Sequence, residues 1–538
     1  MNNSHCFTNL SPLTFLERAG RYRPGMPAVV LSNRTVSFGE MLHRSRRMAS
    51  MLRSLGVSSG DRVGLLAHNS LLSIEAHYGI PATGAMIVAF NPWLPSSDIA
   101  KQITFSGTQV LLVNTDTYQQ ARRIVKGTNC RTVLILDDGN EPLIVDPETF
   151  IFESTQNQFD SDLALDLSIT DENAGIAINF TSGTTGEPKG VMYSHRAAYL
   201  HAMGQTAMLG LTRKSRYFWS LPMFHVNGWG HMWAAVAASA PQVVDIASAG
   251  LDYEGLAKRV AEAGATHIAG APRILRHIIG PGHEDSVLNG LTVLTGGSAP
   301  TPDLVKFAIK QGVDLIHQYG LSETCGPFVV CEPADEWDDI SLDQQAEKRL
   351  RQGIPALHAG VGLRVVDDNF DDVGWDGRSL GEVVMSGNSV ALGYFNNPEA
   401  TAKAFKHGWF CSGDIAVIHP DGYLEIKDRI KDLIFVETAY GWENISSIEI
   451  ENVIAQFPGI RDIAVVGKRG ANPAIIAFYE KDSAALINQE DVSAFCRKTL
   501  PEFKVPAFYF ETTLPKTATG KVKKNVLEAE IHKLISEI

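Results

Sequence analysis

Ten consecutive residues, Thr181 to Gly190, have the composition of a loop that holds phosphate groups. Three glycines remove side-chain obstruction, while hydroxyl groups come from Ser182, Thr184 and Thr185 and a positive charge from Lys189. The loop follows an apolar run, GIAINF, that is typical of a buried strand. The Gly-Lys-Ser/Thr order of a Walker A loop is missing. The segment therefore predicts a triphosphate-binding loop of another kind, and a polar surface turn is the weaker interpretation.

Five further motifs follow this loop along the chain. They are Thr295-Gly-Gly-Ser-Ala-Pro300, Gln318-Tyr-Gly-Leu-Ser-Glu-Thr324, Trp409-Phe-Cys-Ser-Gly-Asp414, Asp428-Arg-Ile-Lys-Asp432 and Pro515-Lys-Thr-Ala-Thr-Gly-Lys521. In order and approximate spacing they resemble the adenylate-forming superfamily of acyl-CoA synthetases, luciferases and peptide-synthetase adenylation domains. The resemblance runs nearly end to end and is nearest to bacterial fatty-acyl and medium-chain acyl-CoA synthetases.

The resemblance implies an α/β fold with two domains. The large N-terminal adenylation domain, residues 1–428, would combine stacked α/β subdomains with a small β-barrel. Residues 429–431 would form a hinge, and residues 432–538 a small, mobile α+β domain. Lys431 has the hinge position, where a change of backbone torsion would swing the C-terminal domain between two half-reactions.

The implied first reaction is attack of a carboxylate on the α-phosphorus of ATP, which gives an acyl-adenylate and pyrophosphate. Both reactants are negatively charged, so the site must neutralise charge before they can approach. The resemblance makes Lys521 the catalytic lysine. It places Glu323 and the hydroxyl group of Thr184 on Mg²⁺, a hard cation that prefers oxygen ligands.

The other contacts with ATP are also implied by the resemblance. Asp414 would accept both ribose hydroxyls, because a carboxylate offers two oxygens, and Arg429 would contact ribose and phosphate. Cys411-Ser412 replaces the common Arg-Thr of the family, so the support of Asp414 is expected to differ. The remaining residues would bind the phosphates (Thr181, Ser182, Gly183, Thr185, Gly186, Lys189) and the nucleoside (Gly296, Gly297, Ser298, Tyr319).

The segment Leu221-Pro-Met-Phe-His-Val-Asn-Gly-Trp229 resembles the acyl-binding segment of bacterial fatty-acyl ligases. The resemblance places His225 beside the reacting carboxylate, as a catalytic residue, and makes Trp229 the gate of an acyl channel. Together with Val226, Gly320 and Leu321, these residues predict a pocket for an apolar acid. Core packing is the alternative role of His225 and Trp229.

The chain departs from its relatives in the segment that bears on the acceptor of the second half-reaction. Thioester-forming relatives place a glycine beside the pantetheine channel, because only a missing side chain lets the narrow arm pass. Counting back from Ile445 puts Trp442 at that glycine's position, and residues 435–440 lengthen the loop. The candidate acceptor channel is therefore Tyr440, Gly441 and Trp442.

Two interpretations of this loop follow. An indole at position 442 favours transfer of the acyl group to an amine or amino acid, as in the coronafacate-ligase-like and McbA-like amide ligases. The alternative is an acyl-CoA synthetase in which Gly441 takes over and CoA is the acceptor. A non-catalytic sensor is disfavoured, because all the key positions are intact: Lys189, Glu323, Asp414 and Lys521.

The strands and helices that must position these motifs are indicated by alternating patterns of residues in the sequence. Short apolar runs (VGLLA, VLLVN, TVLIL) alternate with helix-like stretches such as residues 38–55, which indicates α/β layers with buried strands. The C-terminal part has its own strand, DIAVVG, and helices at 491–499 and 523–536.

Composition excludes other classes of protein. The 538 residues are 44% hydrophobic and carry a net charge of −13, which argues against disorder and against a nucleic-acid partner. No run approaches the ~18 apolar residues of a membrane span, and the six scattered cysteines have no zinc-binding spacing. We expect a cytoplasmic protein. A homodimer is compatible with the sequence, which does not decide the oligomeric state.

Overall fold

The computed structural model describes residues 7–135, 150–152, 169, 171–181, 189–245, 252–279, 288–438, 441–468, 473–482, 485–516 and 522–535. The chain divides into two compact units. Unit 1 is Met1–Leu363 with Met385–Phe410, and unit 2 is Arg364–Val384 with Cys411–Ile538. The hinge predicted at residues 429–431 falls inside unit 2 and stays a prediction.

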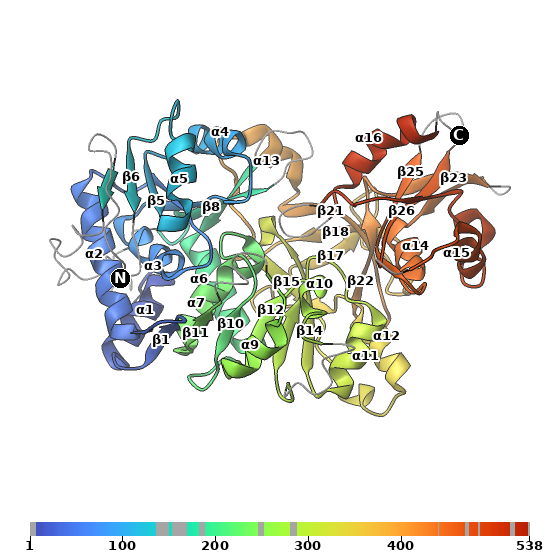
Figure 1. Ribbon diagram of the computed structural model, residues 1–538, viewed down its shortest axis with the longest axis horizontal. Coiled ribbons are helices and arrows are strands. Elements are labelled where there is room, and N and C mark those ends of the chain that lie inside the picture. Colours follow the sequence, from blue (N-terminus) through green and yellow to red (C-terminus); the bar gives the residue numbers. More distant parts are fainter. Residues whose placement is uncertain are drawn as a thin grey trace. The chain divides into compact units, whose positions relative to one another are not determined.

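Unit 1 contains two large sheets, and the first is formed by the apolar runs noted in the sequence (Figure 1). These runs are β3 (Arg62–Leu66), β5 (Val110–Val113), β6 (Thr132–Ile135) and β8 (Gly175–Thr181), whose parallel neighbours bury them. The prediction of buried strands is therefore confirmed. Across the sheet the order is β19 (Gly393–Tyr394), β9 (Lys189–Ser194), β8, β4 (Met86–Ala89), β3, β5, β6 and β7 (Phe150–Phe152).

The second sheet of unit 1 carries two of the sequence motifs at one edge. Its strands β13 and β14 are parallel neighbours, with Thr295 opposite His317, so their carboxyl ends lie side by side. The order is β16 (Ile354–Pro355), β15 (Gly326–Val330), β14 (Asp314–Leu321), β13 (Thr292–Thr295), β12 (His267–Gly270), β10 (Tyr217–Trp219), β11 (Gln242–Val244), β1 (Pro27–Val30) and β2 (Thr35–Ser37).

Helices of unit 1 pack on these sheets through one apolar face each. In α2 (Phe38–Ser54), buried residues recur at helical spacing, and the Ser37 hydroxyl caps the first turn by accepting from the Glu40 N–H. This confirms the helix predicted at residues 38–55. Figure 1 shows α4 (Ser96–Ser106) and α5 (Thr115–Ile124) beside β5 and β6. The other helices are α1 (Leu13–Tyr22), α3 (Leu71–Gly79), α6 (His195–Met208), α7 (Val226–Ala238), α9 (Leu256–Glu262), α10 (Pro272–Leu275), α11 (Pro302–Lys310), α12 (Leu342–Arg349) and α13 (Pro398–Ala404).

Unit 2 has the α+β character predicted for the C-terminal part. The predicted strand DIAVVG lies in β25 (Ile460–Lys468), which pairs with β26 (Ala474–Lys481), and β26 pairs with β27 (Phe508–Glu511). The helices are α14 (Ser447–Ile454), α15 (Gln489–Cys496) and α16 (Lys524–Ile535), and an apolar core joins α14 and α15 to this sheet.

A further sheet has five strands. Its strands are β17 (Leu363–Val366), β18 (Gly381–Met385), β21 (Trp409–Ile418), β20 (Phe405–Lys406) and β22 (Leu424–Arg429), with β22 paired to β21. A separate hairpin consists of β23 (Ile434–Thr438) and β24 (Gly441–Ile445). Among the helices that the structure describes, none combines the length and apolarity needed to cross a bilayer.

Candidate functional site

The predicted phosphate loop connects two paired strands of unit 1. Strand β8 ends at Thr181, β9 begins at Lys189, and these two residues are register partners. A Cβ atom at Gly190 would lie 2.7 Å from Ile178 Cγ2, so the last glycine of the motif is required by strand packing. The loop tip, with the predicted Ser182, Gly183, Thr184, Thr185 and Gly186, lies outside the described residues, and their roles stay predictions.

Tyr394 connects the predicted phosphate-binding and metal-binding residues. Its hydroxyl group donates a 2.7 Å hydrogen bond to Glu323 Oε1, and Lys189 Nζ lies 5.3 Å from the centroid of its ring. Lys189 is near the ring because β19 pairs with β9, the strand that Lys189 begins, with Tyr394 opposite Val191. Burial and the charge of Glu323 raise the pKa of Tyr394, so the phenol stays protonated and remains a donor.

The carboxylate of Glu323 fits the expected Mg²⁺ ligand. Mg²⁺ in nucleotide sites is usually held by one or two carboxylates together with phosphate oxygens, rather than by a cage of protein ligands. Among the residues that the structure describes, no group of three or more His, Cys, Asp or Glu side chains forms such a cage. Glu323 lies on η4 (Ser322–Thr324), and the hydroxyl group of Tyr394 orients its carboxylate. A single carboxylate is what a cation shared with a bound triphosphate requires.

We expect Glu323→Gln to raise the apparent dissociation constant of Mg²⁺ in the first half-reaction by about tenfold, because it removes an anionic oxygen ligand. The amide oxygen still accepts from Tyr394, so the local structure should persist. The measurement is a Mg²⁺ titration of pyrophosphate release. Glu399→Gln, on an exposed position of α13, is the matched control. Identical titrations for the two variants would show that Glu323 is not a metal ligand.

The predicted nucleoside residues lie at the carboxyl edge of β13 and β14. Gly296 lets the end of β13 approach β14, because a Cβ atom there would lie 2.8 Å from Gln318 O, and Gly320 lets β14 approach β15, because a Cβ atom there would lie 2.1 Å from Gly326 O. Gly297 has φ of +84°, and both Gly297 and Ser298 are exposed. Tyr319 is half-buried on β14. The structure thus brings the two nucleoside motifs together.

A cavity of about 30 Å³ lies next to these glycines in unit 1. Its apolar lining includes Leu221, Ala269 and Leu294, from three different segments. Gly320 is the predicted acyl-site residue in this lining.

The other predicted acyl-site residues occupy different positions. His225 is half-buried just before α7, where its carbonyl accepts from the Gly228 N–H at 3.0 Å. Val226 is buried on α7, and neither His225, Val226 nor Leu321 belongs to the cavity lining. Trp229 lies in α7, but its side chain is outside the described residues. The catalytic role of His225 and the gate at Trp229 remain predictions.

In unit 2, the predicted ribose-binding Asp414 and Arg429 face each other across β21 and β22. They are register partners, and Arg429 Nε lies 3.1 Å from Asp414 Oδ1. Asp414 is almost fully buried. The Ser412 hydroxyl accepts from the Asp414 N–H at 3.0 Å and donates to Val383 O at 2.7 Å. Ser412 thus supplies the local support that the departure at Cys411-Ser412 called into question.

The loop expected to carry the catalytic lysine is closed by an isolated bridge between Lys516 and Val522. Lys521 itself lies outside the described residues. Lys516 anchors the start of the loop, with Nζ 2.7 Å from Asp462 Oδ2 and 3.0 Å from Glu480 Oε2. The ends of the loop are therefore fixed to unit 2.

Lys524 anchors the other end of this loop. Its Nζ lies 2.7 Å from Glu451 Oε1 and donates to Ser447 Oγ at 2.5 Å. The Ser447 hydroxyl and backbone N–H both donate to Asp428 Oδ2, at 2.8 and 2.5 Å. Burial lowers the pKa of Lys524, but the charges of Glu451 and Asp428 outweigh it and raise that pKa above its ordinary value. The ammonium group therefore stays charged.

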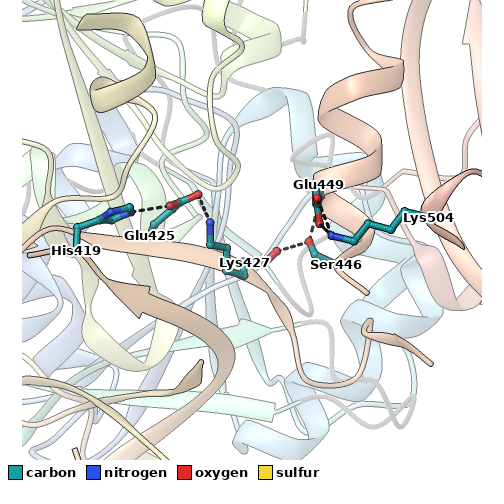
Figure 2. A network of polar contacts seen from close by, with 6 residues as sticks. All are labelled: His419, Glu425, Lys427, Ser446, Glu449 and Lys504. Atoms are coloured by element: carbon teal, nitrogen blue, oxygen red, sulfur yellow. Dashed lines mark hydrogen bonds and ion pairs between the residues drawn. The ribbon is translucent and has the colours of Figure 1, made fainter. Parts of the chain in front are cut away.

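Polar contacts also involve β22, the strand that leads into the predicted hinge (Figure 2). Lys431 lies in the turn between β22 and β23. Before the turn, Lys427 O accepts from the Ser446 hydroxyl at 2.6 Å, and the Lys427 ammonium pairs with Glu425, which also pairs with His419. Figure 2 shows this chain of contacts beside the ion pair of Glu449 with Lys504 on unit 2. A rotation that separates α14 from β22 would break the bond between Ser446 and Lys427.

The segment predicted as a lengthened acceptor loop is a regular hairpin. Strands β23 and β24 pair from Ile434 and Ile445 to Thr438 and Gly441, and Trp442 is the register partner of Glu437. Tyr440 lies outside the described residues. Residues 435–438, part of the predicted lengthening at 435–440, therefore lie in a paired strand.

Comparison with known proteins agrees with this arrangement. The AMP-binding enzyme family model matches residues 16–395, and the model of the AMP-binding enzyme C-terminal domain matches residues 449–521. The chain belongs to the AMP-binding enzyme family, the adenylate-forming superfamily of ATP-dependent, acid-activating ligases.

Particular proteins resemble the chain over almost its whole length. The 4-hydroxybutyrate–CoA ligase 2 of Metallosphaera sedula is 35% identical over 97% of this chain and 95% of its own length. Five further relatives, 32% to 34% identical, also carry the names of CoA ligases.

Solved structures share the fold at lower identity. The anthranilate CoA ligase AuaEII, in complex with anthranoyl-AMP, superposes with a TM-score of 0.85 at 22% identity and covers all of both chains. The amide bond synthetase McbA from Marinactinospora thermotolerans superposes with a TM-score of 0.80 at 22% identity, covering 96% of this chain and 99% of its own. A CoA ligase and an amide synthetase thus have the same fold, so the fold does not decide the acceptor.

Proposed function

We propose that this protein is an acyl-CoA synthetase. It activates a carboxylic acid with ATP and Mg²⁺ to an acyl-adenylate, releases pyrophosphate, and then transfers the acyl group to the thiol of CoA. The acceptor rests on the likeness, over 97% of the chain, to a relative that is named a CoA ligase. This choice revises the preference for an amine that Trp442 suggested in the sequence.

The residues at the two predicted half-sites have complementary roles in this proposal. In unit 1, Lys189 holds phosphate oxygens and Glu323, fixed by Tyr394, holds the cation that neutralises the triphosphate. In unit 2, Asp414 and Arg429 bind the ribose side of the nucleotide. Lys521 bridges the carboxylate and the α-phosphate as negative charge develops between them.

The hairpin geometry supports CoA as the acceptor. The sequence-based argument for an amine rested on Trp442 at the position of the glycine beside the pantetheine channel and on a longer loop at residues 435–440. Because Ile434–Thr438 pairs with Gly441–Ile445, part of this additional length lies in paired strands. In this proposal Gly441, next to Trp442, is the residue that the pantetheine arm of CoA passes closely.

Amide formation is the second candidate, and Trp442 is the observation that favours it. Both candidates share the first half-reaction, so only the transfer step separates them. An indole beside the channel would slow a long, narrow arm more than it slows a compact amino acid.

The deciding experiment offers wild-type protein ATP, Mg²⁺ and an acid, together with equal concentrations of CoA and an amino-acid mixture. Products are identified by mass. We expect the acyl-CoA thioester as the main product. Amide as the main product, together with increased thioester formation by Trp442→Gly, would establish the amide ligase in its place.

A further inference from the structure

Two residues that line the cavity in unit 1 carry buried polar atoms with no hydrogen-bond partner among the described residues. His231, on α7, is 1% exposed and lines the cavity. Its Nδ1 lies 2.7 Å from the Tyr217 hydroxyl, whereas its Nε2 is buried with no hydrogen-bond partner among the described residues. Buried polar atoms in native proteins are normally paired, so an atom of this kind beside a cavity indicates a missing ligand or water.

The hydrogen bond with Tyr217 determines which nitrogen of His231 carries the proton. Burial lowers the pKa of His231 to about 4 and raises that of Tyr217, so both groups are neutral near pH 7. No other acceptor for the phenol is found among the described residues, so Tyr217 donates to Nδ1. The imidazole proton is then on Nε2, which is a hydrogen-bond donor.

Gln318 supplies a second polar atom to the same cavity. It lies on β14 at the carboxyl edge of the sheet, and its Nε2 is 3.5 Å from Gln205 Oε1. Its Oε1 is buried and lacks a partner among the residues described. The cavity thus combines a donor on His231 with an acceptor on Gln318, between apolar walls. A volume of about 30 Å³ holds only a few heavy atoms.

We propose that this cavity recognises a hydroxyl group on a short acyl chain, so that the preferred acid is a short-chain hydroxy acid. A hydroxyl group can accept from His231 Nε2 and donate to Gln318 Oε1 at the same time. Methylene groups of the chain contact Leu221, Ala269 and Leu294. A methyl group in place of the hydroxyl would leave both polar atoms unpaired. A site of this kind rejects the methyl analogue more strongly than an apolar pocket rejects an added hydroxyl group.

This inference rests on the proposed acid activation and makes His231 a specificity-determining residue. It also revises the expectation of an apolar acid. The prediction of an apolar acid agrees with the walls of the cavity. The two polar side chains, however, select a hydroxyl group on the acid.

The test compares acids in which a hydroxyl group and a methyl group are exchanged. The pairs are 4-hydroxybutyrate with pentanoate and 3-hydroxybutyrate with 3-methylbutyrate. Pyrophosphate release with ATP and Mg²⁺ is measured without CoA, so the result does not depend on the acceptor. For at least one pair, we expect kcat/KM of the wild type to be about tenfold or more higher for the hydroxy acid.

Two variants connect this preference to the cavity. His231→Leu keeps a side chain of similar volume and should abolish or reverse the preference. Tyr217→Phe removes only the hydroxyl that fixes the imidazole tautomer, so it should weaken the preference for the hydroxy acid. Tyr253→Phe removes another buried hydroxyl that is not part of the cavity lining, and it should leave the preference intact.

Two results would overturn the inference: a wild type that prefers the methyl analogue in both pairs, or a preference that persists unchanged in both His231→Leu and Tyr217→Phe. In either case pyrophosphate release would still support acid activation. Absence of pyrophosphate release with every acid would overturn the proposed function, and this inference with it.

Discussion

Lys521→Ala lowers the rate of acyl-adenylate formation by about a hundredfold or more, equivalent to about 3 kcal/mol of transition-state stabilisation. The expected cause is loss of the ammonium group that bridges the carboxylate and the α-phosphate as charge develops. Folding should not change, because the anchors of the loop are Lys516 and Lys524. The measurement is pyrophosphate release in single turnover.

The control for this prediction follows from the structure. Lys516 and Lys524, two lysines near Lys521 in the sequence, are both bound to carboxylates of unit 2. Lys523 is exposed, so Lys523→Ala should leave the rate of acyl-adenylate formation nearly unchanged. Transfer from pre-made acyl-adenylate to the acceptor should persist in Lys521→Ala. Equal losses in both half-reactions would contradict the assignment of Lys521 to the first step.

Lys524→Met destabilises unit 2 by about 3 to 5 kcal/mol, because it leaves Glu451 and Asp428 without their cation in a largely buried cluster. The Lys524 and Glu451 side chains are only 16% and 18% exposed. The measurement is native-state hydrogen exchange of the backbone amides in α14 and α16, which reports local opening without assuming two-state unfolding.

A double variant separates the charge effect from loss of packing. Lys524→Met combined with Glu451→Leu removes both members of the pair, and should recover part of the lost protection. The contrary result is a free energy of local opening, for the amides of α14 and α16 in Lys524→Met, that stays within about 0.5 kcal/mol of the wild-type value. It would show that the charged cluster contributes little to the stability of unit 2.

Local patterns in the sequence predicted the strands and the motif positions well. The apolar runs became β3, β5, β6 and β8 because buried parallel strands need continuous apolar residues. The hairpin of β23 and β24 was not predicted, because pairing depends on the register of two segments and on a turn whose composition gave no clear signal.

The residues that the sequence missed act through distant contacts. Tyr394 contacts Glu323, 71 positions earlier in the chain, and just before β19 the Ala391 N–H donates to Glu323 O at 2.8 Å. Its local signal was the aromatic pair Tyr394-Phe395 before Asn-Asn-Pro. His231 appeared as one more residue of an apolar helix, and its role depends on Tyr217 and on a cavity formed by several segments. Neither cross-sheet neighbours nor cavities can be read from residue spacing.

Tyr394 also has a consequence for the state of the protein before nucleotide arrives. Its neutral ring contacts the cation of Lys189 on one side and the anion of Glu323 through its hydroxyl, and no ion pair joins Lys189 to Glu323 in the described part of the chain. If the two charges neutralised each other, a triphosphate would first have to separate them. The phenol keeps both charges available, so binding of ATP with its cation requires little electrostatic reorganisation.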